Sequence, residues 1–262
     1  MGDLSLHFAT PPAKCCKEAV IGLVKAMQRD REIALSKVKN KNIEVVMSLI
    51  RCLDIESLRN WQVVADLVRA FGIVKWGGPM GDEDKFKNPT PGMAGIYQTP
   101  NQIAKALVYL SELTVNSYLE IGVFQGGNFI FVSEYLRRFN PQIQCTGIDP
   151  TDYLNEEIKE VIDANPYMTF RAVTSAEIAG KEFDLVLIDG DHSAEWVARD
   201  WENVGRHAKY CMVHDIQDAY CPDVVWYWGN IKGDNPVTFL DNTSAGPLMG
   251  IGIICNDAVV RS

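Results

Sequence analysis

The feature of this sequence that most restricts its fold is a regular alternation of short apolar runs with amphipathic stretches, from about residue 99 onward. Five of the apolar runs read SYLEIG, IQCTGID, MTFRAV, FDLVLIDG and YCMVHDI, and helical patterns separate most of them. Short apolar strands that alternate with helices are typical of a doubly wound, mostly parallel sheet. The sequence therefore predicts an α/β domain over residues 99–262.

Two further signals concern the ends of this domain. Thr99 followed by Pro100 predicts a helix start, because a Thr side chain can accept hydrogen bonds from free N–H groups and proline needs no donor at the first helical position. We expect this helix to end near Leu113. The last two apolar runs, PVTFLD and MGIGIIC, lie close together across a turn at residues 244–247 and predict an antiparallel edge pair.

The N-terminal part has a different rhythm. Apolar residues recur three and four positions apart between residues 13 and 71, which predicts a small all-helical cap over residues 1–75. Residues 76–98 are rich in Gly, Pro and charge and predict a long loop, for which a lid and a plain linker both remain open. Exposed apolar faces on such a cap would be natural surfaces for a homo-oligomer.

Composition and charge disfavour several classes of protein. The formal net charge is −9, whereas nucleic-acid-binding proteins usually carry a basic surface. A nucleic-acid partner is therefore not expected. No apolar run is long enough to cross a bilayer, and the first residues lack the pattern of a secretion signal, so we expect a cytoplasmic protein without a membrane partner.

The seven cysteines do not form a recognisable ligand pattern. They lack a CxxC pair, so their spacing predicts neither a zinc site nor a disulfide framework. Cys145, Cys211 and Cys255 lie in apolar runs and are expected to be buried thiols, which pack as small apolar groups.

A glycine-bearing turn joins the first predicted strand of the domain to a helix, in the sequence YLEIGVFQGGN. In an open α/β sheet, ligands bind beyond the carboxyl ends of the strands, where glycines let them approach the backbone. Phe124 stands where a dinucleotide-binding turn would have its second glycine, and the carboxylate of Glu120 precedes Gly122. A negative charge there suits a cationic amino-acid ligand better than a pyrophosphate, and Asp149, at the end of the next strand, is placed to accept ribose hydroxyls.

The segments LEIGVFQGGN, GIDP, FDLVLIDGDHS, MVHDI, VVWYWGNIK and GIGII together resemble the Rossmann-like methyltransferases that use S-adenosylmethionine. Within that class they are most similar to small-molecule O-methyltransferases, including those acting on sugars. The resemblance covers about residues 98–255 and leaves out the helical N-terminus. It implies a seven-stranded sheet in the order 3-2-1-4-5-7-6, with the last two strands as an antiparallel edge.

The resemblance also implies where S-adenosylmethionine would bind. The turn of residues 172–176 would border the adenine, Asp149 the ribose, and Glu120 and Gly122 the methionine part. Phe124 departs from the usual glycine and leaves the geometry of the turn open. The residues expected to bind this cofactor are Glu120, Gly122, Phe124, Gly126, Gly127, Asn128, Asp149, Thr174, Ser175 and Asp189.

Acidic and histidine side chains follow two adjacent predicted strands. Asp189 and His192 come after one strand, and His214 and Asp215 end the next. Carboxylates converging from neighbouring strand ends suit Mg²⁺, so Asp189, Asp215 and His214 are the candidate metal ligands. Relatives carry two acidic or amide residues where this chain has His214 and Asp215, so a metal-free variant also remains open.

Catalysis is expected at Asp189 and His192. In similar sugar O-methyltransferases a histidine at this offset removes the proton of the acceptor hydroxyl, and the ordinary pKa of histidine suits a general base. Asp191 is expected to cap the following helix, on whose first turn we place His192. Trp226, Tyr227 and Trp228 could wall an acceptor pocket or lie in the core, but three adjacent helical residues cannot all face inward.

The interpretation we favour is S-adenosylmethionine-dependent O-methylation of a small hydroxylated molecule, a sugar or a secondary metabolite, with a metal, Mg²⁺, assisting and His192 as base. Three alternatives remain: a donor-binding protein without transferase activity, a methyltransferase for RNA or protein, and a nucleotide-linked oxidoreductase or hydroxylase. Glu120 and the missing glycine oppose the last of these.

Overall fold

The computed structural model describes residues 41–73, 95–154, 156–243 and 246–256. The turn at residues 244–245, most of the loop at 76–98 and the first 40 residues lie outside the described part, and so does the boundary predicted between cap and loop. Helices of the described N-terminal part are α2 (Lys41–Cys52), α3 (Ile55–Leu58) and α4 (Trp61–Phe71). This part is helical, as predicted.

A seven-stranded sheet organises the rest of the described chain, in the order β3-β2-β1-β4-β5-β7-β6. Strands β1 (Ser117–Ile121), β2 (Gln144–Ile148), β3 (Met168–Arg171), β4 (Leu185–Ile188) and β5 (Tyr210–His214) pair in parallel. Strand β7 (Gly246–Cys255) runs antiparallel to both β5 and β6 (Val237–Thr243). The predicted fold class and strand order are confirmed.

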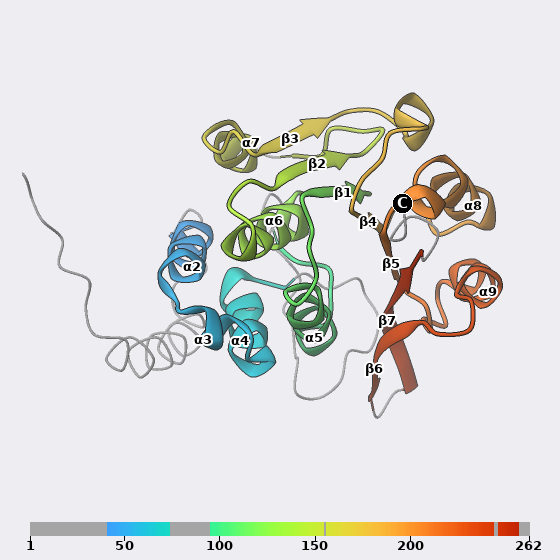
Figure 1. The fold of residues 1–262 in the computed structure, drawn as a ribbon, viewed down its shortest axis with the longest axis horizontal. Coiled ribbons are helices and arrows are strands. Elements are labelled where there is room, and N and C mark those ends of the chain that lie inside the picture. Colours follow the sequence, from blue (N-terminus) through green and yellow to red (C-terminus); the bar gives the residue numbers. More distant parts are fainter. Residues whose placement is uncertain (1–40, 74–94, 155, 244–245, 257–262) are drawn as a thin grey trace, which may run out of the picture.

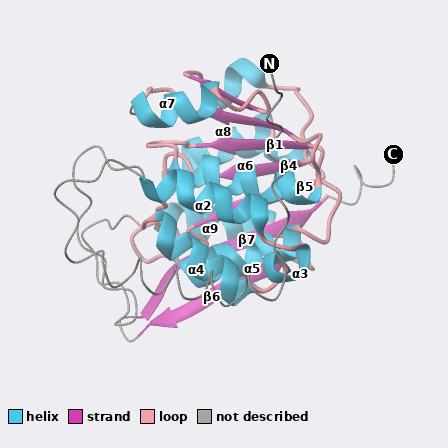
Figure 2. Ribbon diagram, turned by 90° about the vertical axis from the view of Figure 1, so that its left-hand side faces the viewer, coloured by secondary structure: helices cyan, strands magenta, loops and turns pink. Residues whose placement is uncertain are grey.

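Helices cover both faces of this sheet (Figure 1). One face carries α5 (Pro100–Leu110), α6 (Gly127–Phe139) and α7 (Glu156–Asp163), and the N-terminal helices join the same apolar core. The other face carries α8 (Ala194–Asn203) and α9 (Pro222–Ile231), with the short 3₁₀ turns Ser175–Ile178 and Gly205–His207. Figure 2 looks onto the layer that α2, α4, α5 and α6 form over the sheet.

Capping and amphipathicity explain the N-terminal helices. The Asn60 side chain accepts a hydrogen bond from the N–H of Gln62 at the start of α4, and Gly72 ends this helix. The apolar face of α4 is buried and contains Val64, Leu67 and Val68. Its burial against α5 and the core explains why this sequence forms a helix here.

Three local expectations need correction. Thr99 precedes Pro100 at the start of α5, but its side chain forms no capping hydrogen bond, and the helix ends at Leu110 rather than near Leu113. Cys145 and Cys211 are buried, whereas Cys255, the last residue of β7, is exposed. No helix of the described residues is long and apolar enough to cross a membrane.

An ion pair ties the N-terminal helices to the sheet domain. Arg51 on α2 donates two hydrogen bonds, of 2.9 and 2.7 Å, to the two carboxylate oxygens of Glu134 on α6. The Glu134 side chain is only 2% exposed and also accepts from the Tyr167 hydroxyl at 2.6 Å. A bidentate pair of this kind fixes orientation as well as charge.

Arg51→Ala is expected to lower the free energy of unfolding by about 2 kcal/mol, because it leaves a buried carboxylate without its cation. This loss of unfolding free energy is below the usual range for buried ion pairs, because Arg51 itself is half-exposed. Arg206→Ala removes the exposed pair with Glu202 and should cost less than about 0.5 kcal/mol. Urea unfolding of both variants checks this, and equal effects would contradict it.

Candidate active site

A cavity of about 850 Å³ opens at the carboxyl ends of β1, β2, β4 and β5. Its size lies within the range of small-molecule sites. Most of the residues predicted for the site line it: Glu120, Gly122, Phe124, Asn128, Asp149, Thr174, Ser175, Asp189, His192, His214 and Asp215. The sheet therefore brings together side chains that lie almost 100 positions apart in the sequence.

The turn after β1 requires glycine at position 122. Its backbone has a φ of +88°, and a Cβ there would lie 2.1 Å from the carbonyl oxygen of Asp189. The N–H of Gly122 bonds to the carbonyl of Ile148, so the turn is held against both neighbouring strands. Gly122 thus lets the ends of β1 and β4 approach closely at the cavity floor.

Phe124, which replaces the usual glycine, adopts a φ of +47°. This conformation is uncommon for a residue with a side chain. Its N–H donates a 3.0 Å hydrogen bond to Asp149 Oδ2, and its ring packs against Tyr97 and Tyr153, with centroids 5.2 and 5.1 Å away. These contacts fix the conformation of the turn, which could not be predicted from the sequence because Phe124 replaces the usual glycine.

Gly126 and Gly127 do not line the cavity, although both were predicted to bind the cofactor. A Cβ at Gly126 would meet the side chain of Ile158 at 2.6 Å, and one at Gly127 would meet the carbonyl oxygen of Gly95 at 2.1 Å. Close packing of the turn against other segments of the same chain explains both glycines. A sequence pattern alone cannot separate that requirement from ligand contact.

Glu120 is fully buried at the cavity floor. Its carboxylate accepts hydrogen bonds from the Tyr118 hydroxyl at 2.5 Å and from Asn128 Nδ2 at 3.1 Å. Burial raises the pKa of Glu120 to about 8, and the nearby charge of Asp189 adds to this effect while the two hydrogen bonds oppose it. The group is poised to change charge near neutral pH.

Glu120→Gln is expected to alter how stability depends on pH. The folded-state pKa of Glu120 is raised above its unfolded value, so its contribution is fully present below about pH 4.5 and is lost as the pH rises through about 8. Relative to Glu120→Gln, the wild type should lose about 1 kcal/mol per pH unit across much of that window. Denaturant unfolding between pH 5 and 8 measures this; the exposed variant Glu182→Gln serves as control, and parallel curves for wild type and Glu120→Gln would contradict it.

Asp149, at the end of β2, faces the cavity from a buried position. Its two oxygens accept from backbone N–H groups: Oδ1 from Thr151 and Oδ2 from Phe124, each at 3.0 Å. Each carboxylate oxygen has a second lone pair that can accept from a ligand. The side chain is thus held rigidly with acceptors to spare, which suits a pair of ribose hydroxyls.

The predicted adenine turn also lines the cavity, but its hydroxyls are already engaged. Thr174 forms a capping box with Glu177 at the 3₁₀ turn. The Ser175 hydroxyl donates to Asp200 Oδ1 at 2.6 Å and accepts from Asn203. Asp200 lies on α8, lines the same part of the cavity and was not predicted as a site residue. A ligand here can therefore contact the backbone of this turn and the Asp200 side chain, whereas the hydroxyls of Thr174 and Ser175 are already hydrogen-bonded.

Asp189, His214 and Asp215 converge as predicted. The Nδ1 atom of His214 lies 3.0 Å from Asp189 Oδ1 and 3.1 Å from Asp215 Oδ2, yet neither ring nitrogen has a partner in hydrogen-bonding geometry. Burial lowers the pKa of His214, but the charges of Asp189 and Asp215 outweigh burial and raise it well above the ordinary value. Asp215 has a φ of +60°, an unusual conformation that turns its carboxylate toward this group.

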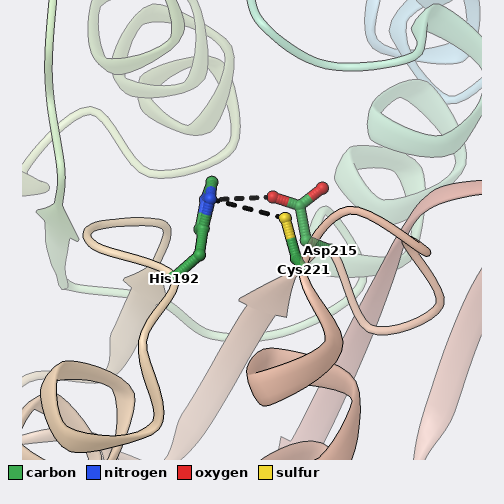
Figure 3. A group of neighbouring side chains, drawn as sticks. All are labelled: His192, Asp215 and Cys221. Carbon is green, nitrogen blue, oxygen red and sulfur yellow. Dashed lines mark hydrogen bonds and ion pairs between the residues drawn. The ribbon is translucent and has the colours of Figure 1, made fainter. Parts of the chain in front are cut away.

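His192 lies in the loop before α8 and not on the first turn of that helix, which begins after Ser193. Asp191 accepts a hydrogen bond from the N–H of Ser193 and so shapes this loop. Figure 3 shows the imidazole of His192 facing both Asp215 and Cys221: Nε2 lies 3.2 Å from Asp215 Oδ2, and Nδ1 lies 3.4 Å from Cys221 Sγ. Chiefly through Asp215, and also through Cys221, the pKa of His192 is raised to about 10.

The cavity as a whole is strongly acidic. Seven carboxyl groups and neither lysine nor arginine are found among its described lining residues, and the seven are Glu120, Asp149, Asp189, Asp191, Asp200, Asp215 and Asp218. Three buried amide oxygens of lining residues also lack a hydrogen-bond donor: Gln98 Oε1, Gln125 Oε1 and Asn128 Oδ1. Unpaired buried acceptors are costly, so this site fits a ligand that brings positive charge and donors.

Several lining residues were missed by the sequence analysis. Gln98, only 1% exposed, donates from Nε2 to Asp189 Oδ2 at 2.7 Å. Asp218 accepts from the N–H groups of Tyr220 and Met249 and orders the loop that carries Cys221. The acidic side chain at 218, three residues beyond Asp215, was the signal that could have indicated Asp218; Gln98 and Cys221 had none.

The aromatic residues of α9 do not wall this cavity. Trp228 is buried in the core, Tyr227 is partly buried and Trp226 is 64% exposed. One of the three thus faces solvent, as helical geometry requires. The aromatic side chains at the cavity are instead Tyr97, Phe124, Trp196 and Tyr220.

Comparisons with known proteins found one family model and several solved structures with similarity to this chain. Residues 119–215 match a family described as a methyltransferase domain. Solved structures with similarity include an O-methyltransferase from Bacillus cereus in complex with S-adenosylhomocysteine (SAH). Its sequence is 12% identical, and the match covers 90% of this chain and 99% of that chain at a TM-score of 0.44. The O-methyltransferase TomG from Streptomyces achromogenes is 15% identical, covering 57% and 77% at a TM-score of 0.42. No curated protein matches the chain.

The sheet order and the strand-end cavity define the Rossmann-like class of methyltransferase fold. Residues 119–215, which run from β1 to Asp215, match the model of a methyltransferase domain family. The resemblance seen in the sequence is therefore confirmed for the part of the chain that carries the glycine turn and the acidic strand ends.

Proposed function

We propose that this protein is an S-adenosylmethionine-dependent O-methyltransferase that acts on a small hydroxylated molecule, a sugar or a secondary metabolite, with the help of a metal ion. The methyltransferase domain match supports the reaction class. Solved structures of distant relatives hold the methyl donor or its product. The acceptor class rests on the sequence resemblance.

The observation that carries the proposal is the charge of the cavity. S-adenosylmethionine brings a sulfonium and an ammonium group, and seven carboxyl groups with no lysine or arginine line the described cavity. A dinucleotide would place its pyrophosphate against the same carboxylates, which would repel it. The charge thus supports the sulfonium donor over the oxidoreductase alternative.

In this proposal the donor lies along the ends of three strands. Its methionine part lies over the turn at Gly122, where the unpartnered oxygens of Gln125 and Asn128 can accept from the ammonium group. Its ribose hydroxyls donate to Asp149, and its adenine lies against residues 173–175 and Asp200. The methyl group then faces the Asp189 and Asp215 end of the cavity, where the acceptor would bind.

Asp189, His214 and Asp215 offer one ligand atom each, and these atoms all lie within 4.8 Å of one another. Two carboxylate oxygens suit Mg²⁺, whereas the imidazole nitrogen is a poorer ligand for it. When bound, a divalent cation here would polarise the acceptor hydroxyl and favour its deprotonation. Gln98 would hold Asp189 in place through its 2.7 Å hydrogen bond.

The role predicted for His192 as general base meets an obstacle. A pKa near 10 leaves the imidazole protonated at neutral pH, and both ring nitrogens already have partners. His192 can accept a proton from the acceptor only if the charge of Asp215 is compensated, because that charge is what holds the proton on the ring. The base role therefore depends on what binds beside Asp215.

The test is transfer of a labelled methyl group from S-adenosylmethionine to a panel of monosaccharides, phenols and catechols, with total RNA and a protein mixture as further acceptors. The proposal expects label in an O-methyl ether of a small molecule, and loss of transfer in Asp189→Ala. Label in RNA or protein would favour the macromolecular alternative. Donor binding without any transfer would favour a donor-binding protein.

A further inference from the structure

Asp189, His214 and Asp215 form one group of possible metal ligands, which we call the carboxylate cluster. Beside it the cavity contains a second group of side chains that can bind metal. His192, Asp215 and Cys221 each offer one ligand atom, and these atoms lie within 4.8 Å of one another. They come from the loop after β4 and the loop after β5, as Figure 3 shows. The group shares Asp215 with the carboxylate cluster, so the two sites adjoin.

A tight backbone turn places Cys221 back over Asp215. The N–H of Asp218 bonds to the carbonyl of Asp215 at 3.2 Å, and the N–H of Cys221 bonds to the carbonyl of Asp218 at 3.0 Å. The Asp218 side chain fixes this turn by accepting from the N–H groups of Tyr220 and Met249, at 2.8 and 3.0 Å. Four hydrogen bonds therefore hold the turn that carries Cys221 and so place its thiol at the cavity.

An independent observation comes from His214. Its side chain is only 4% exposed, neither ring nitrogen has a hydrogen-bond partner, and Nδ1 lies 3.1 Å from the same Asp215 Oδ2 that His192 contacts. His214 Nδ1 lies close to carboxylate oxygens without hydrogen-bonding geometry to them. A cation bound among these atoms would explain this arrangement. The Nε2 atom of His214 has no partner at all among the described residues, and an unpartnered buried nitrogen is costly.

We propose that the cavity binds a borderline-soft divalent cation of the zinc type, held by Cys221, His192 and Asp215, with His214 beside them. Thiolate and imidazole ligands select zinc-like ions, whereas magnesium prefers an all-oxygen set. The cation would also compensate part of the acidic charge of the cavity. The spacing of the cysteines in the sequence did not indicate such a site, because its ligands come from two loops.

For the reaction, this inference rests on the function proposed above. Three protein ligands leave a fourth position open, as in catalytic zinc sites, and the acceptor oxygen would take it. On binding, the Cys221 thiol and the His192 imidazolium would each release a proton to solvent, so that a thiolate and a neutral imidazole would hold the metal. His192 is then a ligand and not the base.

The experiment is a titration of the chelator-treated full-length protein with Co²⁺, followed by absorbance. A thiolate bound to Co²⁺ produces a charge-transfer band in the near ultraviolet, which oxygen and nitrogen ligands do not give. We expect one saturating band, displaced by Zn²⁺, which binds such sites more tightly than Co²⁺, and unaffected by excess Mg²⁺. Isothermal calorimetry with Zn²⁺ gives the affinity.

Cys221→Ser should abolish the band and weaken Zn²⁺ binding by about 100-fold or more, above the usual effect of losing an outer partner. The matched control is Cys255→Ser, since Cys255 is exposed on β7 and lies away from the cavity lining. Both variants are made in a Cys15→Ser/Cys16→Ser background, which removes an adjacent thiol pair outside the described residues. His192→Ala should weaken Zn²⁺ binding while the band persists at higher Co²⁺.

A missing band in the wild type, or a band retained in Cys221→Ser, would overturn the inference. Unchanged melting of Cys221→Ser excludes unfolding as the cause of a lost band; if this variant does not fold, His192→Ala decides by its Zn²⁺ affinity. SAH binding is measured on the same samples. Donor binding without a cobalt band contradicts only the metal site, whereas a band without donor binding contradicts only the proposed function.

Discussion

Asp149→Ala should weaken binding of SAH by roughly 100-fold, or about 3 kcal/mol, because the proposed binding mode loses two hydrogen bonds from ribose hydroxyls to a carboxylate. The same change removes the acceptor for the N–H of Phe124, which holds the glycine turn. Calorimetric titration of SAH into the variant measures the loss. An affinity within about threefold of the wild type would show that the ribose binds elsewhere.

Two variants sharpen this prediction. Asp149→Asn keeps the shape, but both oxygens of Asp149 accept backbone N–H groups, so the amide nitrogen would face the N–H of either Thr151 or Phe124. We therefore expect Asp149→Asn to bind SAH weakly too. Asp152→Asn, three residues further on, removes an exposed ion pair with Lys159 and should leave SAH binding unchanged.

Gly122→Ala is expected to destabilise the fold by about 3 kcal/mol. The new Cβ would lie 2.1 Å from the carbonyl oxygen of Asp189, so the ends of β1 and β4 must separate, and the positive φ adds its own cost. For a chain of this size the melting temperature should fall by roughly 6–12 °C. Thermal unfolding measures this, and SAH binding should weaken with it.

Gly180→Ala provides the matched control. Gly180 also has a positive φ, +77°, but a Cβ there would have no atom within 4 Å. It should therefore cost only about 1 kcal/mol, the conformational part of the effect. Equal shifts in melting temperature for the two variants would contradict the close contact between Gly122 and the end of β4.

The fold could be predicted from the sequence because its signals are local. Apolar runs such as FDLVLIDG and YCMVHDI became β4 and β5, and the acidic residues that end them, Asp189 and Asp215, lie side by side at the sheet edge. Parallel strands bring their carboxyl ends to one edge, so position along each strand sufficed to place these groups. The strand order came from the family resemblance.

The finer features of the site depend on contacts that the sequence does not encode locally. Gln98 reaches Asp189 across 91 positions, and Cys221 reaches His192 across a loop whose turn is set by Asp218. Gly126 could not be assigned, because steric packing against α7 and ligand contact both call for glycine. The pairing that raises the pKa of His192 was equally invisible, since it needs the turned backbone of Asp215.

The most direct test of the central claim is a calorimetric titration of the wild-type protein with SAH and, separately, with NAD⁺. The proposed donor site predicts that SAH, which keeps the ammonium group, ribose and adenine of the donor, binds with a dissociation constant in the micromolar range, about −8 kcal/mol, and that NAD⁺ does not bind. Binding of NAD⁺ in preference to SAH, or of neither, would contradict the assignment of this cavity to a sulfonium methyl donor.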